Sequence, residues 1–275
     1  MQLIGETLRF SASDLVGHVD CHHLTALDAA VARGELERPR FWDPLLQALF
    51  DRGLAHEHAY VEHLRQTGHE VVEIDGPAGI DQTRVDKTIK SMRAGVGVIV
   101  QGAFLRDGWA GRTDILKRVE VSSALGAWSY EVIDTKLARR TKGATILQLC
   151  LYSELLSAVQ ARMPEYMHVV TPGTGFRPES YRTASFGAYY RQARRGFEHF
   201  LRRESGESTY PEPNEHCPVC VWRTPCAARR RADDHLCLVA GITKVQIGEL
   251  RRRDIGTTGA LAVTPLPLTP RMRRR

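Results

Sequence analysis

Three features common in membrane proteins, secreted proteins and small disulfide-rich domains are missing from this 275-residue sequence. It contains no run of about 18 uncharged apolar residues, so we expect no membrane-spanning helix. The first ten residues, MQLIGETLRF, lack the basic and then apolar layout of a secretory signal peptide. The six cysteines are too few for a disulfide scaffold in a chain of this length. We therefore expect a cytoplasmic protein with reduced thiols.

The composition is typical of a globular protein with a sizeable core. Hydrophobic residues make up 43% of the chain, and its length suits one large domain or one domain with a small appendage. The formal net charge is +6. This balance favours a polyanionic partner, because lysine and arginine release counterions from phosphates on binding. Many basic proteins bind no nucleic acid, so the charge alone does not identify the partner.

The spacing of apolar residues predicts helices in the first third of the chain. We expect a capped helix over 11–35, with Cys21 inside it, and a second over 43–67 that Gly53 interrupts. A short β-branched strand at 70–75 and a third helix over 82–94 follow.

The middle of the chain changes to strands. From residue 95 onward, three alternating segments separated by glycine-containing turns predict an antiparallel meander. A helix over 145–163, a strand at 166–172 that returns to the same sheet, and a long helix over 183–204 come next. This order predicts the α/β class, with a mixed central sheet flanked by helices.

The last quarter of the chain is rich in proline and arginine. A loop is expected over 210–231, then a small helical appendage at 233–265 that resembles a helix-hairpin-helix segment, and a disordered basic tail at 266–275. Because the chain stops soon after this small unit, we expect it to be a fragment of a longer architecture.

Two aspartates and a lysine in the predicted meander are the candidate catalytic residues. Side chains alternate along a strand, so Asp134 and Lys136 project from one face, and a neighbouring strand can bring Asp114 beside them. Two carboxylates can hold a divalent cation, and a lysine can orient water or stabilise charge on a phosphate. This chemistry suits phosphodiester hydrolysis. An Asp-x-Lys pair alone is most often a solvated strand face.

The wider spacing resembles a known family. Gly-x-x-Asp ending at Asp114, then Asp134 and Lys136 after two hydrophobic residues, then a helix with Gln148 and Tyr152, is similar to the RecB-like branch of the PD-(D/E)xK nucleases. The resemblance implies a restriction-endonuclease-like fold in which both aspartates ligate Mg²⁺ or Mn²⁺ and the lysine is catalytic. It also implies that Gln148 and Tyr152, one helical turn apart, support the site and contact DNA.

That branch also has a histidine on an upstream helix as a further metal ligand. The segment RGLAHEHAYVEHL offers His56, His58 and His63, and an Arg-Gly followed by a His-Glu pair favours His56. The spacing from Gly53 leaves both His56 and Glu57 open for this role. A histidine-rich helix that is simply solvated is the alternative.

Three cysteines cluster in CPVCVWRTPC, namely Cys217, Cys220 and Cys226. Thiolates this close can share one metal centre, and Cys21 is the natural fourth ligand. A CxxC pair alone favours zinc. The whole pattern, however, resembles the iron–sulfur staple of AddB-type, Cas-type and related RecB-like nucleases. It implies a 4Fe-4S cluster that joins the ends of a nuclease domain spanning 1–232.

Together these motifs predict a metal-dependent deoxyribonuclease, and the resemblance implies an exonuclease acting on single-stranded ends in DNA repair or recombination. The expected partners are DNA and a helicase, in cis or in trans. The alternatives are a non-catalytic DNA-binding or assembly module of a nuclease–helicase, a Cas-type adaptation exonuclease, and a zinc-stapled structural protein with no nucleic-acid role.

Overall fold

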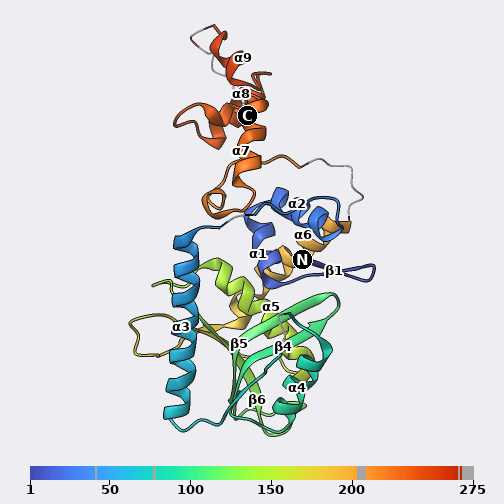
Figure 1. Cartoon of the computed structure of the whole chain (residues 1–275), viewed down its shortest axis with the longest axis vertical. Helices are drawn as coiled ribbons and strands as arrows, with labels where there is room; N and C mark the ends of the chain where they lie inside the picture. The colour runs from blue at the N-terminus through green and yellow to red at the C-terminus, as the bar shows by residue number, and fades with distance from the viewer. Residues whose placement is uncertain (41, 77–78, 203–208, 266, 268–275) are drawn as a thin grey trace, which may run out of the picture. The chain divides into compact units, whose positions relative to one another are not determined.

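A computed structural model describes residues 1–40, 42–76, 79–202, 209–265 and 267. The chain divides into two compact units, Met1–Glu207 and Ser208–Arg275 (Figure 1). The cysteine-rich loop belongs to the second unit, whereas the predicted nuclease domain, 1–232, includes it through its expected link to Cys21. Apart from Pro267, the expected basic tail lies outside the described residues. Within the described ranges, no helix is long and apolar enough to cross a membrane.

The first unit begins with a hairpin and two short helices. Strands β1 (Gln2–Ile4) and β2 (Thr7–Arg9) pair antiparallel. The expected helix over 11–35 is instead α1 (Ala12–Asp20) and α2 (His22–Ala32), with Cys21 in extended backbone between them. The prediction of Cys21 inside a helix is therefore wrong. Apolar residues continue at helical spacing on both sides of the break, so the sequence gives no sign of it.

Helix α3 (Pro44–Gln66) is continuous. Asp43 caps it by accepting a hydrogen bond from the Leu45 amide at 2.9 Å, and Pro44 starts it where a missing N–H does no harm. Gly53 does not interrupt this helix, contrary to expectation. A glycine costs a helix only about 1 kcal/mol, and the second half of α3 buries three large side chains, Tyr60, Val61 and Leu64.

A six-stranded mixed sheet forms the centre of this unit, in the order β3-β4-β5-β6-β7-β8. The strands are β3 (Val71–Glu73), β4 (Val98–Arg106), β5 (Trp109–Val119), β6 (Ser129–Thr135), β7 (Tyr166–Val170) and β8 (Glu179–Arg182). Strands β4, β5 and β6 form the predicted antiparallel meander. Strand β7 returns to the sheet parallel to β6, as expected, and β3 lies parallel to β4.

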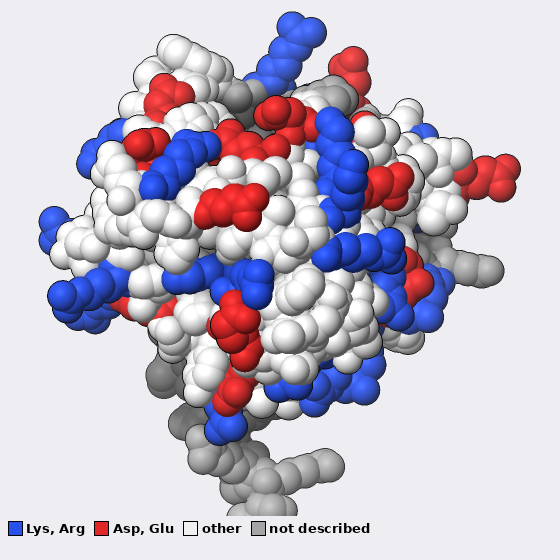
Figure 2. All heavy atoms as spheres, turned by 90° about the horizontal axis from the view of Figure 1, so that it is seen from below, with Lys and Arg blue, Asp and Glu red and all other residues white. Residues whose placement is uncertain are grey.

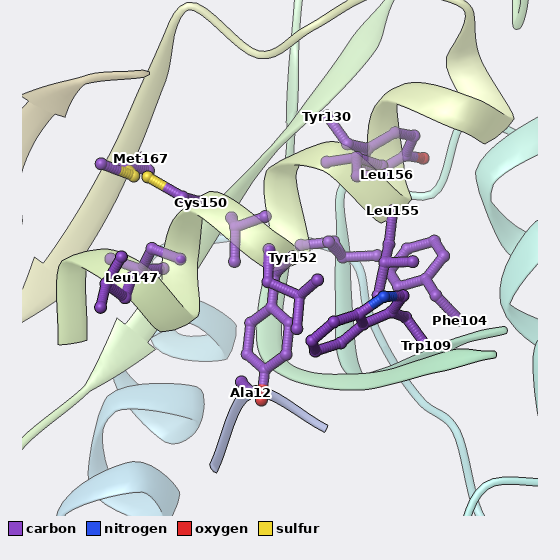
Figure 3. Close-up of a cluster of buried hydrophobic side chains, with 14 of the residues drawn as sticks. Ala12, Phe104, Trp109, Tyr130, Leu147, Cys150, Tyr152, Leu155, Leu156 and Met167 are labelled. Atoms are coloured by element: carbon purple, nitrogen blue, oxygen red, sulfur yellow. The ribbon is translucent and has the colours of Figure 1, made fainter. Parts of the chain in front are cut away.

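Helices pack on both faces of the sheet, so the expected mixed α/β architecture is confirmed. Helix α5 (Gly143–Gln160) buries Leu155 and Leu156 in the larger core cluster, together with Met167 of β7 (Figure 3). Helices α4 (Gln82–Arg93) and α6 (Gly187–Arg202) contribute Met92 and Phe197 to that cluster. A second cluster joins α3 to side chains from β4, β5, β6 and β7: Val98, Val100, Ile115, Ile133 and Val170.

The second unit is small and helical. Its described residues form two 3-10 turns, η2 (Cys217–Val219) and η3 (Leu236–Leu238), and three helices, α7 (Arg223–Ala232), α8 (Lys244–Arg251) and α9 (Thr258–Ala262). Leu236, Ile247, Leu250 and Ile255 form its core. The helix-hairpin-helix resemblance of 233–265 stays a prediction.

Candidate active site

Two aspartates face each other where the ladder between β5 and β6 ends. Ile115 pairs with Ile133, so the antiparallel register places Asp114 opposite Asp134 at the next position. The backbone N–H of Thr135 donates to Asp114 Oδ2 at 2.9 Å, and the Thr135 hydroxyl donates to the same oxygen at 3.2 Å. The structure thus brings together the two predicted acids and fixes the orientation of Asp114.

Asp134 is the buried member of the pair, with 0% of its surface exposed. Its Oδ2 lies 2.6 Å from Lys136 Nζ, and the lysine side chain is about one third exposed, at 31%. Its Oδ1 accepts a hydrogen bond from Gln148 Nε2 at 3.1 Å. The alternation expected for residues 134 and 136 is therefore observed, and the lysine links the buried acid to solvent.

Helix α5 supplies the side chains that hold Asp134 in position. Gln148 Nε2 also donates to the Tyr152 hydroxyl at 3.3 Å, so one amide bridges Asp134 and Tyr152. The Tyr152 ring is buried among core side chains (Figure 3). A Cβ at Gly111 would come within 3.0 Å of that ring and 2.7 Å of Leu155. The glycine of the Gly-x-x-Asp motif therefore makes room for the tyrosine that supports the site.

The environment of Asp134 disfavours its ionised form. Burial raises the pKa of Asp134, the nearby Asp114 carboxylate raises it further, and Lys136 opposes both effects. The single positive charge of Lys136 cannot balance the negative charges of both Asp114 and Asp134. A divalent cation would relieve this repulsion, so the donor chemistry of the pair fits Mg²⁺ or Mn²⁺.

Helix α3 brings both of its candidate ligands to the same edge. Burial raises the pKa of Glu57 and the charge of Asp114 adds to this, which places the Glu57 carboxylate in the electrostatic field of the acid pair. His56 Nε2 lies 3.3 Å from the carbonyl oxygen of Val170, and that carbonyl also accepts a hydrogen bond from the Lys136 amide. Of the two residues that the sequence left open, Glu57 is the one coupled to Asp114.

Gln101 is a site residue that the sequence analysis missed. Its neighbours in β4 pair with Ile115 and Thr113, so Gln101 lies opposite Asp114, yet it is skipped by the ladder and has a φ of 56°. Its side-chain amide donates to the Glu57 carboxylate. Left-handed backbone at a non-glycine residue is unfavourable and often marks a functional site. The one signal in the sequence was a polar Gln-Gly pair inside an apolar strand.

Arg112 stands two residues before Asp114 in β5 and is exposed. Burial raises the pKa of both Glu57 and Tyr152, and the charge of Arg112 opposes part of this rise, so Arg112 lies near the acids. No ion pair of Arg112 is found in the parts of the chain that the structure describes. On the face shown in Figure 2, acidic and basic side chains are interspersed, so the net positive charge is not gathered there into one patch.

The predicted metal ligands do not form a closed cage. Among the described residues, no three or more His, Cys, Asp or Glu side chains form a group that could hold a metal ion. His56 in particular lies against the Val170 carbonyl rather than completing a set with Asp114 and Asp134. Mg²⁺ is usually held by one or two carboxylates, with waters and phosphate oxygens in its remaining positions. The acid pair alone is consistent with that mode.

The four predicted cluster ligands are divided between the two units. Cys21 lies between α1 and α2, whereas Cys217 begins η2, Cys220 follows it and Cys226 lies in α7. All four side chains are partly buried. The backbone N–H of Asn214 donates to Cys217 Sγ at 3.4 Å. Such N–H···S bonds are among the interactions that tune iron–sulfur clusters.

Comparison with known proteins gives no family for this chain. No family model matches it, and no curated protein matches it. One similar solved structure is the crystal structure of SSO0001. That protein is 14% identical, and the match covers 82% of this chain and 88% of SSO0001, with a TM-score of 0.32. A likeness at this level carries no argument about fold or function.

Proposed function

We propose that the first unit is a metal-dependent deoxyribonuclease of the RecB-like type, with a restriction-endonuclease-like fold, that hydrolyses DNA at single-stranded ends. The observation that carries the proposal is the juxtaposition of Asp114 and Asp134 across β5 and β6, with Lys136 Nζ 2.6 Å from Asp134. Two carboxylates beside a lysine, all at one edge of a sheet, are the groups that phosphodiester hydrolysis needs.

Each residue of the site has a distinct role in this proposal. Asp114 and Asp134 would hold Mg²⁺ or Mn²⁺, and the ion would supply Lewis-acid activation of the attacking water and of the scissile phosphate. Lys136 stabilises negative charge that develops on the phosphate. Gln148 holds the Asp134 carboxylate in place, and Tyr152 anchors Gln148 from the core side.

Helix α3 supplies a further group to the metal side of the site. Glu57 suits this role better than the predicted His56, because the charge of Asp114 acts on it and Gln101 holds its carboxylate. In this proposal the His56 side chain, which contacts the Val170 carbonyl at the end of β7, lies beside the site and does not bind the metal.

The test is digestion of single-stranded DNA labelled at either end, with Mn²⁺ or Mg²⁺ present. Asp134→Asn should reduce the rate at least about a hundredfold. Asp107→Asn, which removes an exposed aspartate from the β4–β5 turn, should leave it unchanged. Full activity of the Asp134 variant would refute the site. Binding of DNA by the wild type without cleavage would favour the non-catalytic DNA-binding module instead.

For the cysteines we propose a 4Fe-4S cluster on Cys21, Cys217, Cys220 and Cys226. Four thiolates suit such a cluster. Protein purified without oxygen should contain iron and absorb visible light, and serine at any of the four positions should reduce both. Cys237→Ser, in the core of the second unit, should not. Zinc in place of iron would establish the alternative metal.

A further inference from the structure

A pocket of about 400 Å³ lies within the first unit, and neither Asp114 nor Asp134 lines it. Glu154 and Ser157 of α5 line it, whereas Gln148 of the same helix does not. Arg191 and Arg194 of α6 and the β4–β5 turn form other parts of its wall. The volume is in the range of sites for small molecules, which is roughly 300–1,000 Å³.

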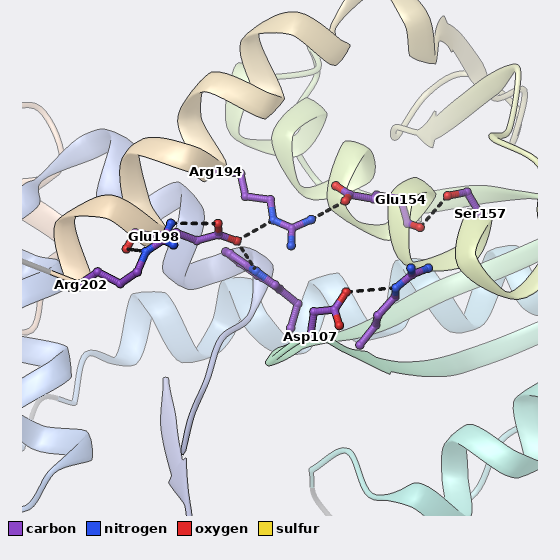
Figure 4. Close-up of polar contacts among 8 residues, drawn as sticks. Asp107, Glu154, Ser157, Arg194, Glu198 and Arg202 are labelled. Atoms are coloured by element: carbon purple, nitrogen blue, oxygen red, sulfur yellow. Dashed lines mark hydrogen bonds and ion pairs between the residues drawn. The ribbon is translucent and has the colours of Figure 1, made fainter. Parts of the chain in front are cut away.

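Three arginines but only two acidic residues line this pocket: Arg106, Arg191 and Arg194 against Asp107 and Glu154. Arg194 donates to Glu154 and also to Glu198, at 2.9 Å, so its charge is matched (Figure 4). Arg106 pairs with Asp107 at 3.1 Å, although both side chains are more than half exposed and such pairs are weak. Arg191 takes part in no ion pair within the described ranges. Among the described residues, the Arg191 guanidinium therefore has no acidic partner, and the Arg106 guanidinium has only a weak one, Asp107.

The rest of the lining suits a ligand with an apolar body. Tyr190, Leu155 and Met163 contribute ring, methyl and thioether surface. The wall also contains the buried hydroxyl of Thr183, which has no hydrogen-bond partner among the described residues. Buried hydroxyls normally find a partner, so this wall has unused hydrogen-bonding capacity.

We propose that this pocket binds a small phosphate-bearing molecule, with Arg191 and Arg106 as the residues that hold the phosphate. Guanidinium groups form paired, charge-assisted hydrogen bonds to phosphate oxygens, which makes arginine the preferred residue for such ligands. A nucleoside monophosphate has both the phosphate and an apolar face for Tyr190 and Met163. Inorganic phosphate carries only the first of these features.

The site is tested by calorimetric titration of the full chain with thymidine monophosphate and, separately, with inorganic phosphate, both without added metal. We expect the nucleotide to bind more tightly than phosphate. Arg191→Gln should weaken nucleotide binding about tenfold. Arg195→Gln, one helical turn further along α6 and outside the pocket, should have no effect.

A third variant separates this site from the proposed nuclease site. Asp134→Asn should bind the nucleotide as the wild type does, because Asp134 does not line the pocket. Nucleotide binding that is unchanged in Arg191→Gln, that disappears in Asp134→Asn, or that is absent from the wild type would each overturn the proposal. Since no catalysis is measured, a failed nuclease assay leaves the proposal standing.

Discussion

Asp114 lies directly opposite Asp134 on neighbouring antiparallel strands, and the Thr135 amide next to Asp134 donates to Asp114 Oδ2 at 2.9 Å. One acid is therefore held by the backbone of the strand that carries the other. Separation of the two carboxylates would require breaking the end of the β5–β6 ladder. The paired strands therefore hold the two carboxylates close together despite their repulsion.

This arrangement predicts an unusual effect of Asp134→Asn on stability. A carboxyl group whose pKa is raised on folding favours the folded state at low pH and disfavours it as pH rises. The variant, which keeps the acceptor for Gln148, should gain stability relative to the wild type between about pH 5 and pH 8, by at least about 1 kcal/mol. Denaturant unfolding with a metal chelator present measures this. A variant that instead loses relative stability as pH rises would contradict it.

The sequence predicted the meander, the return of β7 and the meeting of Asp114 with Asp134, because strand periodicity and spacing are local properties that decide them. It did not predict the break at Cys21 or the left-handed backbone at Gln101. Both depend on tertiary contacts: Gln101 is turned toward Glu57 on a helix 44 residues away. Apolar periodicity carries no information about such contacts.

The sequence likewise could not decide whether His56 or Glu57 is the further metal ligand, because this too depends on tertiary contacts. The two residues are adjacent on one helix, so spacing in the sequence gives each nearly the same chance of reaching the site. The direction of each side chain follows from how α3 packs through Tyr60 and Val61 on the sheet. That packing places Glu57 near Asp114 and His56 against the Val170 carbonyl.

Ala161 ends helix α5 with left-handed backbone, at φ 50° and ψ 27°. This conformation costs an L-residue about 1 kcal/mol and costs glycine almost nothing. Because the Ala161 side chain is exposed, Ala161→Gly should stabilise the protein by about 0.5–1 kcal/mol. Ala158→Gly, inside the same helix, should destabilise it by about 1 kcal/mol. Thermal unfolding of the two variants should therefore shift in opposite directions.

Buried His18 should make folding sensitive to acid. Burial lowers its pKa from 6.5 to about 4, with a further contribution from His22, against which its ring stacks. The unfolded chain therefore takes up a proton before the folded chain does. Stability should fall as pH drops from 6.5 to about 4, by up to about 3 kcal/mol. His18→Gln should lose much of this dependence, whereas the exposed His69→Gln should keep it; equal acid sensitivity in both variants would exclude His18 as the cause.

Arg112 is the basic side chain best placed to bind the DNA backbone at the proposed site. It is exposed, stands two residues before Asp114 and has no ion-pair partner among the described residues. In the Asp134→Asn background, which should bind DNA without cutting it, Arg112→Gln should weaken binding and reduce the slope of log affinity against log salt by about 1. Lys90→Gln removes the same charge from an exposed position on α4 and should leave the slope unchanged. If the two variants behave alike, Arg112 contributes only to the overall charge; if Arg112→Gln alone lowers the slope, its guanidinium contacts a phosphate beside the acid pair.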